Sequence, residues 1–131
     1  MSHHHPDHTI LAGIFEKAKC VTFDARLIYD KDIILKFDKH TLGKDVEIVE
    51  TPGHTLEDLS LLVSTPQGMV AVAGDAIWWI DGEEQLFDIN QKDHSQAKGM
   101  NIGELIESRK KLLENADYII PGHGKMFKVQ K

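Results

Sequence analysis

Histidine and aspartate side chains cluster at the start of the chain in a spacing that suits a metal ion. The first eight residues contain the pattern H-x-H-x-D-H, whose donors are His3, His5, Asp7 and His8. Neutral imidazole nitrogens and carboxylate oxygens are ligands that zinc, iron and manganese accept. A histidine run after Met-Ser also resembles an expression tag. The continuation Pro-Asp-His is unusual for a tag and favours the metal-ligand interpretation.

Three further candidate ligands follow glycine-containing turns later in the chain. His54 lies in Thr-Pro-Gly-His, Asp75 in Gly-Asp and His123 in Pro-Gly-His-Gly. Glycine beside each ligand lets the backbone turn sharply and approach a site without a Cβ in the way. Each turn comes after a short apolar run, and open α/β sheets place their sites at such strand ends. The sequence therefore predicts that the three side chains meet along one edge of a sheet.

The combined set of seven donors indicates a pair of metal ions, because one tetrahedral zinc ion needs fewer ligands. Two ions roughly 3.5–4 Å apart, sharing a bridging carboxylate, can hold a bridging hydroxide and polarise a carbonyl or phosphoryl oxygen. We therefore expect two divalent ions, with zinc as the first expectation and iron or manganese as alternatives. Such a site would perform hydrolysis without a serine or cysteine nucleophile.

Short strands and two helices are the elements that would position these side chains. Apolar residues recur at helical spacing over 9–17 and again over 101–115, where Asn101-x-x-Glu104 resembles a capping box. Branched or alternating apolar runs predict strands over 20–23, 33–37, 46–50, 59–63, 69–73 and 118–120. Residues 80–100 form a mostly polar connection. The fold class predicted is α/β (α+β).

Bulk properties favour one globular domain in a reducing compartment. A length of 131 residues fits a single domain. The net charge of −6 leaves no broad basic surface for a nucleic acid, so an RNA partner would need a local patch or bound metal. Cys20 is the only cysteine, which excludes an intrachain disulfide and favours the cytoplasm. We see no signal peptide and no apolar run long enough to span a membrane.

The order H-x-H-x-D-H, T-P-G-H, G-D and P-G-H-G resembles the motif set of the metallo-β-lactamase superfamily. The resemblance covers residues 2–127, and segments 51–58 and 118–129 most resemble one subgroup of that family. It implies an αββα-type layered sandwich formed by a single domain, 1–131. It also implies that the first metal is bound by His3, His5 and His54, the second by Asp7, His8 and His123, and that Asp75 bridges them. Asp7 and Asp75 would assist proton transfer.

The chain departs from the family at its start and at selected site positions. Family members carry strands ahead of the histidine motif, whereas only Met1 and Ser2 precede His3, so we expect an N-terminally truncated form of the fold. A homodimer that exchanges edge strands would complete the sheet. Asp75 stands where the dinuclear zinc β-lactamases carry cysteine, which argues against antibiotic hydrolysis. His5 is not glutamate, which argues against the diiron flavoprotein relatives.

The leading hypothesis is a metal-dependent hydrolase that acts on an ester, thioester or phosphodiester. The alternatives are a metal-dependent endoribonuclease, an iron-dependent persulfide dioxygenase that uses one ion, and an incomplete metal-binding domain without turnover. The substrate, a small molecule or RNA, stays open, and no membrane partner is expected.

Two groups of residues outside the motifs allow simpler interpretations. Trp78 and Trp79 follow Asp75 and could form a pocket wall, although core packing is the simpler expectation for both. The charges from Glu107 to Glu114, Arg109 among them, are expected to form the solvated face of the last helix.

Overall fold

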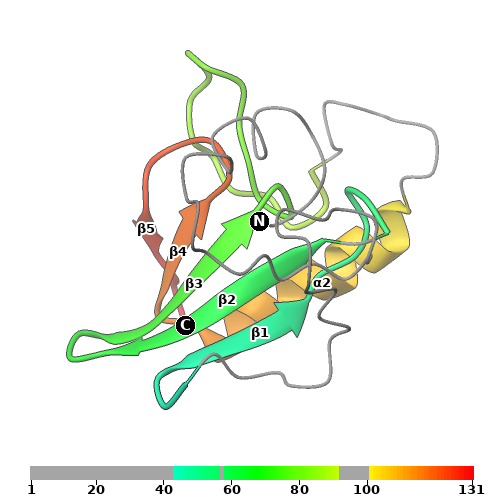
Figure 1. The fold of residues 1–131 in the computed structure, drawn as a ribbon. Helices are drawn as coiled ribbons and strands as arrows, with labels where there is room; N and C mark the ends of the chain where they lie inside the picture. Colours follow the sequence, from blue (N-terminus) through cyan, green and yellow to red (C-terminus); the bar gives the residue numbers. More distant parts are fainter. Residues whose placement is uncertain (1–42, 57, 92–100) are drawn as a thin grey trace, which may run out of the picture.

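One mixed sheet with a helix against it makes up the part of the chain that the structure, a computed structural model, describes: residues 43–56, 58–91 and 101–131. The sheet has five strands in the order β1-β2-β3-β4-β5 (Figure 1). They are β1 (Val46–Glu50), β2 (Leu59–Thr65), β3 (Gly68–Gly74), β4 (Tyr118–Pro121) and β5 (Phe127–Lys128). The helix α2 (Ile102–Asn115) lies between β3 and β4 in the chain.

The sheet contains both antiparallel and parallel pairs of strands. β1, β2 and β3 pair antiparallel in sequence, with a tight turn at Pro66 and Gln67 between β2 and β3. β3 and β4 are parallel because the chain crosses between them through α2, as a parallel pair requires. β5 then returns antiparallel to β4. As a result β1, β3 and β4 all run in the same direction and end at the same edge of the sheet.

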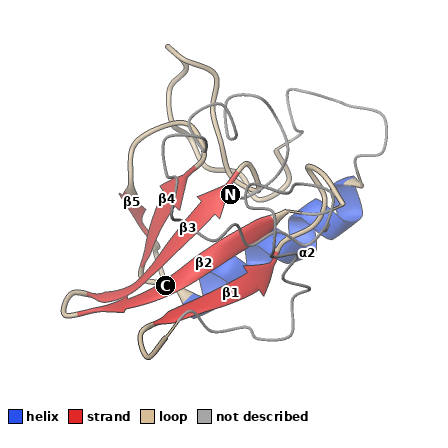
Figure 2. Cartoon of the chain, in the orientation of Figure 1, coloured by secondary structure: helices blue, strands red, loops and turns tan. Residues whose placement is uncertain are grey.

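The core lies between the sheet and α2. Leu62, Ala71 and Ile119 are partners across three adjacent strands, so their side chains share one face, and all three are buried. Leu105 and Leu112, two turns apart on α2, are fully buried in the same cluster. Figure 2 shows α2 lying across this face of the sheet. Burial of these apolar side chains fixes the register of both elements.

The beginning of α2 is set by its cap. The Asn101 side chain accepts hydrogen bonds from the backbone N–H groups of Gly103 and Glu104, at 3.1 and 3.3 Å. These bonds satisfy two of the donors that a helix leaves unpaired at its first turn. The helix predicted from Asn101 onward is therefore confirmed, and the residue that begins it is the one the sequence indicates.

The sequence predictions agree closely with the described strands. Those over 46–50, 59–63, 69–73 and 118–120 correspond to β1 to β4, which extend the last three by one or two residues. β5 was not predicted, since a strand of two residues has no alternation to detect. The helix over 9–17 and the strands over 20–23 and 33–37 lie outside the described residues. No helix within the described ranges is long and apolar enough to cross a membrane.

Candidate functional site

Three of the predicted ligands lie just past the ends of β1, β3 and β4. His54 follows β1, Asp75 follows β3 and His123 follows β4. Because these strands run in the same direction, their ends meet at one edge of the sheet. The sequence prediction that the three side chains meet at such an edge agrees with the structure. Their role as metal ligands stays a prediction.

The carboxylate of Asp75 lies between the two imidazoles. Its Oδ2 is 3.5 Å from His54 Nε2, and its Oδ1 is 3.9 Å from His123 Nε2. Each oxygen of one carboxylate therefore faces a different ring nitrogen. This is the arrangement expected of a carboxylate that bridges two ions, each of which also takes one imidazole.

The site has a buried floor and an open side. His54 and Asp75 are 2% and 4% exposed, whereas the His123 side chain is 37% exposed. A carboxylate buried so deeply needs cations or hydrogen-bond donors around it, because burial disfavours its charge. Bound cations would meet that requirement at Asp75, and the site is open to solvent at His123.

Backbone hydrogen bonds and the close approach of Gly122 hold the turns of Asp75 and His123 together. The Gly122 N–H donates to the carbonyls of Gly74 at 2.8 Å and Ile77 at 3.0 Å, and the Trp79 N–H donates to the His123 carbonyl at 3.2 Å. A Cβ on Gly122 would collide with Asp75 Oδ1 and with the Gly74 backbone. Only glycine at 122 lets the two turns approach this closely.

The turn that carries His54 is supported by α2. The Ser108 hydroxyl donates to the Pro52 carbonyl at 2.7 Å, and the Asn101 N–H donates to the Gly53 carbonyl at 3.1 Å. Gly53 has a φ of +136°, and a Cβ there would collide with the backbone of Leu105. The helix thus fixes the position of His54 through contacts on the two residues before it.

Asp58 is a buried carboxyl near the site that the sequence analysis did not select. It is 3% exposed, and its Oδ2 accepts a hydrogen bond from the Thr55 N–H at 2.6 Å. Burial raises the pKa of Asp58 from 3.8 to about 6, although the Thr55 hydrogen bond and the nearby His54 oppose this rise. The sequence signal that could have identified Asp58 is its position, four residues after His54 and directly before the apolar strand β2.

The two tryptophans after Asp75 have different environments. The Trp78 ring makes T-shaped contacts with both imidazoles, with centroid distances of 6.1 Å to His54 and 5.8 Å to His123. Trp79 is buried in the core cluster. Core packing is therefore confirmed for Trp79, whereas Trp78, which is only partly buried, forms a wall beside the candidate site.

Arg109 does not lie on a solvated helix face, and that expectation was wrong for this residue. It is 3% exposed, and its guanidinium donates to three backbone carbonyls of the segment after Asp75. The acceptors are Ala76 at 2.8 Å, Ile89 at 3.1 Å and Gln91 at 2.6 Å. Arg109 therefore fastens the segment 76–91 to α2 from inside the molecule.

The other four predicted ligands, His3, His5, Asp7 and His8, lie outside the described residues. Within 43–56, 58–91 and 101–131, no group of three histidine, cysteine, aspartate or glutamate side chains is arranged to hold a metal ion by itself. The described site therefore fits one part of a metal centre, with two imidazole nitrogens around a buried carboxylate, and needs further donors to complete it.

Curated proteins are similar to this chain in sequence. An uncharacterized protein of Caenorhabditis elegans is 32% identical over 143 residues, which covers 98% of this chain and 35% of the relative. The metallo-beta-lactamase domain-containing protein 1 of Xenopus laevis is 40% identical over 90 residues, covering 68% of this chain and 35% of the relative. The protein of the same name from Rattus norvegicus is 30% identical over 134 residues, covering 98% and 50%.

These relatives extend beyond the matched region, since the chain spans half of their length or less. No family model matches the chain. The subgroup that segments 51–58 and 118–129 most resemble is metallo-β-lactamase domain-containing protein 1 with its small archaeal relatives, and the similarity to the former is confirmed.

Proposed function

The chain belongs to the metallo-β-lactamase superfamily, and from this premise we propose that it is a metal-dependent hydrolase with a dinuclear zinc-type centre. Its proposed substrates are an ester, a thioester or a phosphodiester. The observation that carries the proposal is the position of Asp75, whose two carboxylate oxygens face His54 Nε2 and His123 Nε2 at 3.5 and 3.9 Å.

The proposed ligand set joins the described residues to the N-terminal motif. His54 with His3 and His5 would hold one ion, and His123 with Asp7 and His8 would hold the other, with Asp75 as the carboxylate that both sites would share. The ions, when bound, supply Lewis acidity that activates water and polarises the scissile bond. Iron and manganese are accepted by the same donors and stay alternatives to zinc.

The protein's own groups provide the rest of the proposed chemistry. Asp75 and Asp7 are the carboxylates proposed to accept and return a proton, since a carboxylate beside the reacting water is suited to that role. The Trp78 ring borders both imidazoles and would exclude water from one side of the reacting group. The exposed side of His123 leaves the path by which a substrate enters.

Hydrolysis assays on a panel of substrates test this proposal. Zinc-loaded protein is assayed on esters, thioesters, phosphodiesters, RNA and a β-lactam, with and without chelator. We expect turnover of an ester, thioester or phosphodiester that the chelator and Asp75→Ala abolish. Asp81→Ala is the matched control, because Asp81 is an exposed aspartate on the same connection. It should retain full activity.

The remaining outcomes identify the alternatives. Cleavage confined to RNA would indicate the endoribonuclease. A single bound iron with oxygen uptake on a persulfide would indicate the dioxygenase. Bound metal without turnover of any substrate would indicate the metal-binding domain that does not act as an enzyme. The first result would narrow the proposal to the phosphodiesters of RNA, and either of the other two would overturn it.

A further inference from the structure

Asp58 closes the loop that carries His54, although the proposed chemistry gives this buried carboxyl no role. The loop comprises residues 51–58, between the end of β1 and the start of β2. At its base, the Thr51 N–H donates to the Asp58 carbonyl at 2.9 Å. Further along, the Thr55 N–H donates to Asp58 Oδ2 at 2.6 Å. The backbone and the side chain of this one residue therefore hold the loop at its base and near its middle.

The side-chain bond acts on the peptide unit that directly follows His54. The Thr55 N–H belongs to the planar peptide group whose carbonyl is that of His54. Holding this N–H restricts rotation of the backbone from which the imidazole projects. His54 Nε2 lies 3.5 Å from Asp75 Oδ2, so a rotation of this backbone would move the ring relative to that carboxylate. Asp58 is thus placed to set the direction of the His54 side chain.

Asp58 also adds negative charge to the buried side of the site. It is 3% exposed and lies close enough to His54 and Asp75 for their charges to act on its carboxyl. Two buried carboxylates near one another disfavour each other's ionisation unless positive charge is present. A cation held by His54 and Asp75 would supply that charge. The electrostatics of this region therefore favour a bound cation more with Asp58 than without it.

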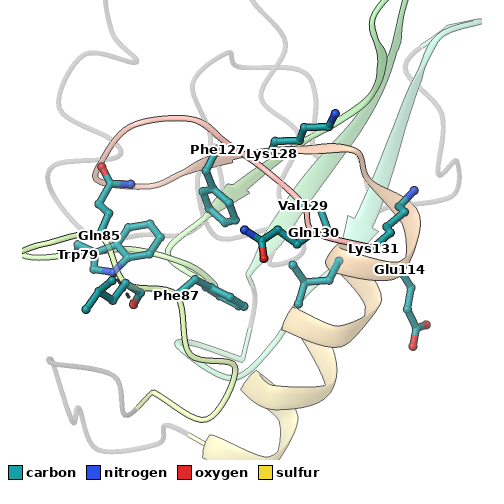
Figure 3. Close-up of a pocket in the computed structure, with 11 residues that line it drawn as sticks. Trp79, Gln85, Phe87, Glu114, Phe127, Lys128, Val129, Gln130 and Lys131 are labelled. Carbon is teal, nitrogen blue, oxygen red and sulfur yellow. Dashed lines mark hydrogen bonds between the residues drawn. The ribbon is translucent and has the colours of Figure 1, made fainter.

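Neutral groups, by contrast, support the turn that carries His123. The Gln85 amide makes two hydrogen bonds with the Lys125 backbone, from Nε2 to the carbonyl at 2.9 Å and from the N–H to Oε1 at 2.6 Å. The Trp79 N–H donates to the His123 carbonyl at 3.2 Å. Figure 3 shows Gln85 and Trp79 on the segment after Asp75. A carboxylate thus supports the His54 loop, and an amide side chain with a backbone N–H supports the His123 turn.

We propose that Asp58 is a positioning residue of the metal centre, which holds the peptide after His54 and raises the affinity for the ion at that histidine. In this role Asp58 touches neither the ion nor the substrate. Because it acts through a predicted metal ligand, the inference rests on the metal centre proposed above, but it does not require turnover of a substrate. Groups that orient metal ligands in this way typically contribute 10–100-fold to metal affinity.

Zinc affinity, measured at pH 8 by competition with a fluorescent chelator, tests this role. Asp58→Asn removes the charge but keeps an oxygen that can accept from the Thr55 N–H, whereas Asp58→Ala removes both. We expect zinc binding at one of the two proposed sites to weaken by about tenfold in Asp58→Asn and by up to about a hundredfold in Asp58→Ala. Glu50→Gln is the matched control, since Glu50 is an exposed carboxylate four residues before His54. Its affinity should change by less than about twofold.

Two further measurements separate positioning from general support of the fold. The visible absorption spectrum of the cobalt-loaded protein reports the geometry of the ligands, and it should change in Asp58→Ala but not in Glu50→Gln. The urea midpoint of metal-free Asp58→Asn should not fall below that of the parent protein, so its affinity would fall without a loss of stability. Asp58→Asn keeps the test available if Asp58→Ala fails to fold, as judged by circular dichroism.

The possible outcomes distinguish this inference from the hydrolase proposal. Parent-like zinc affinity in folded Asp58→Asn and Asp58→Ala would overturn the inference alone. An affinity that falls only together with the stability of the metal-free protein would also overturn it, because that result would indicate a merely structural residue. Zinc binding that depends on Asp58 without turnover of any substrate would support the inference and overturn the hydrolase proposal. A parent protein that binds no zinc would overturn both.

Discussion

Replacing Arg109 with methionine should loosen the fold and the candidate site together. Methionine keeps an unbranched, flexible side chain of similar reach but has no donor, so three backbone carbonyls of the segment 76–91 would lose their partner. A hydrogen bond to a charged group contributes about 1.5–3 kcal/mol, but bonds made by one side chain are not additive. A buried carbonyl left without a donor costs about 1–3 kcal/mol, and because the three carbonyls share one side chain the total should fall below their sum. We expect a loss of about 4 kcal/mol.

Urea denaturation of the metal-free protein measures this loss. With an m value of about 2 kcal/mol/M, a loss of about 4 kcal/mol lowers the urea midpoint by about 2 M. Lys110→Met is the matched control, because Lys110 is exposed and pairs with Glu107 on the helix surface, at 2.7 Å. Its effect should stay below about 1 kcal/mol. Arg109→Lys keeps the charge but not the fork of donors, and its midpoint should fall between the two.

The same substitution should also weaken metal binding, because Ala76, one of the acceptors, directly follows Asp75. Competition with a fluorescent zinc chelator measures that affinity. An Arg109→Met midpoint within about 0.5 M of the parent protein would refute the structural role of this guanidinium. So would a Lys110→Met variant that is equally destabilised.

Three further predictions concern the site. Gly122→Ala should lower zinc content and cost about 2 kcal/mol or more in stability, because its Cβ would displace the Asp75 carboxylate; a variant with full zinc content would contradict this. The pKa of Asp58 is raised to about 6, so the folded state holds this proton more tightly than the unfolded chain and stability falls as the pH rises from about 4 to 6. Asp58→Asn should therefore stabilise the metal-free protein at pH 8 by up to roughly 3 kcal/mol and leave it unchanged below pH 4, whereas an equal gain at both pH values would rule out ionisation as the cause. Removing zinc from the loaded protein should lower the free energy of unfolding by about 3 kcal/mol at a free zinc concentration of 100 times its dissociation constant, and urea curves with and without chelator that coincide would count against metal binding.

Local sequence patterns were sufficient to predict the elements that carry the site. The alternating or continuous apolar runs of β1, β3 and β4 end at glycine-containing turns, and those turns place His54, Asp75 and His123 at one sheet edge. The Asn101 cap likewise marks the start of α2. In each case a pattern a few residues long indicates the element, whereas contacts between distant residues, such as Gly53 with Leu105, fix its position.

Contacts between residues far apart in the sequence determine the features that local patterns did not predict. Arg109 lies in a run of charged residues that resembles an exposed helix face, and its acceptors come from a segment about twenty or more residues away. Trp78 and Trp79 are adjacent in sequence, yet one faces two imidazoles and the other packs in the core. β5 forms only because Phe127 and Lys128 pair with β4. None of these outcomes leaves a local pattern.

The measurement that tests the central claim most directly is the metal content of the zinc-loaded protein after dialysis, determined by mass spectrometry of the metal. We predict about two equivalents of zinc per chain for the parent protein and for Asp81→Ala. Asp75→Ala, folded by circular dichroism, should retain less than about one equivalent, because it removes the carboxylate that faces both imidazoles. Two equivalents retained by Asp75→Ala, or no zinc bound by the parent protein, would contradict the account.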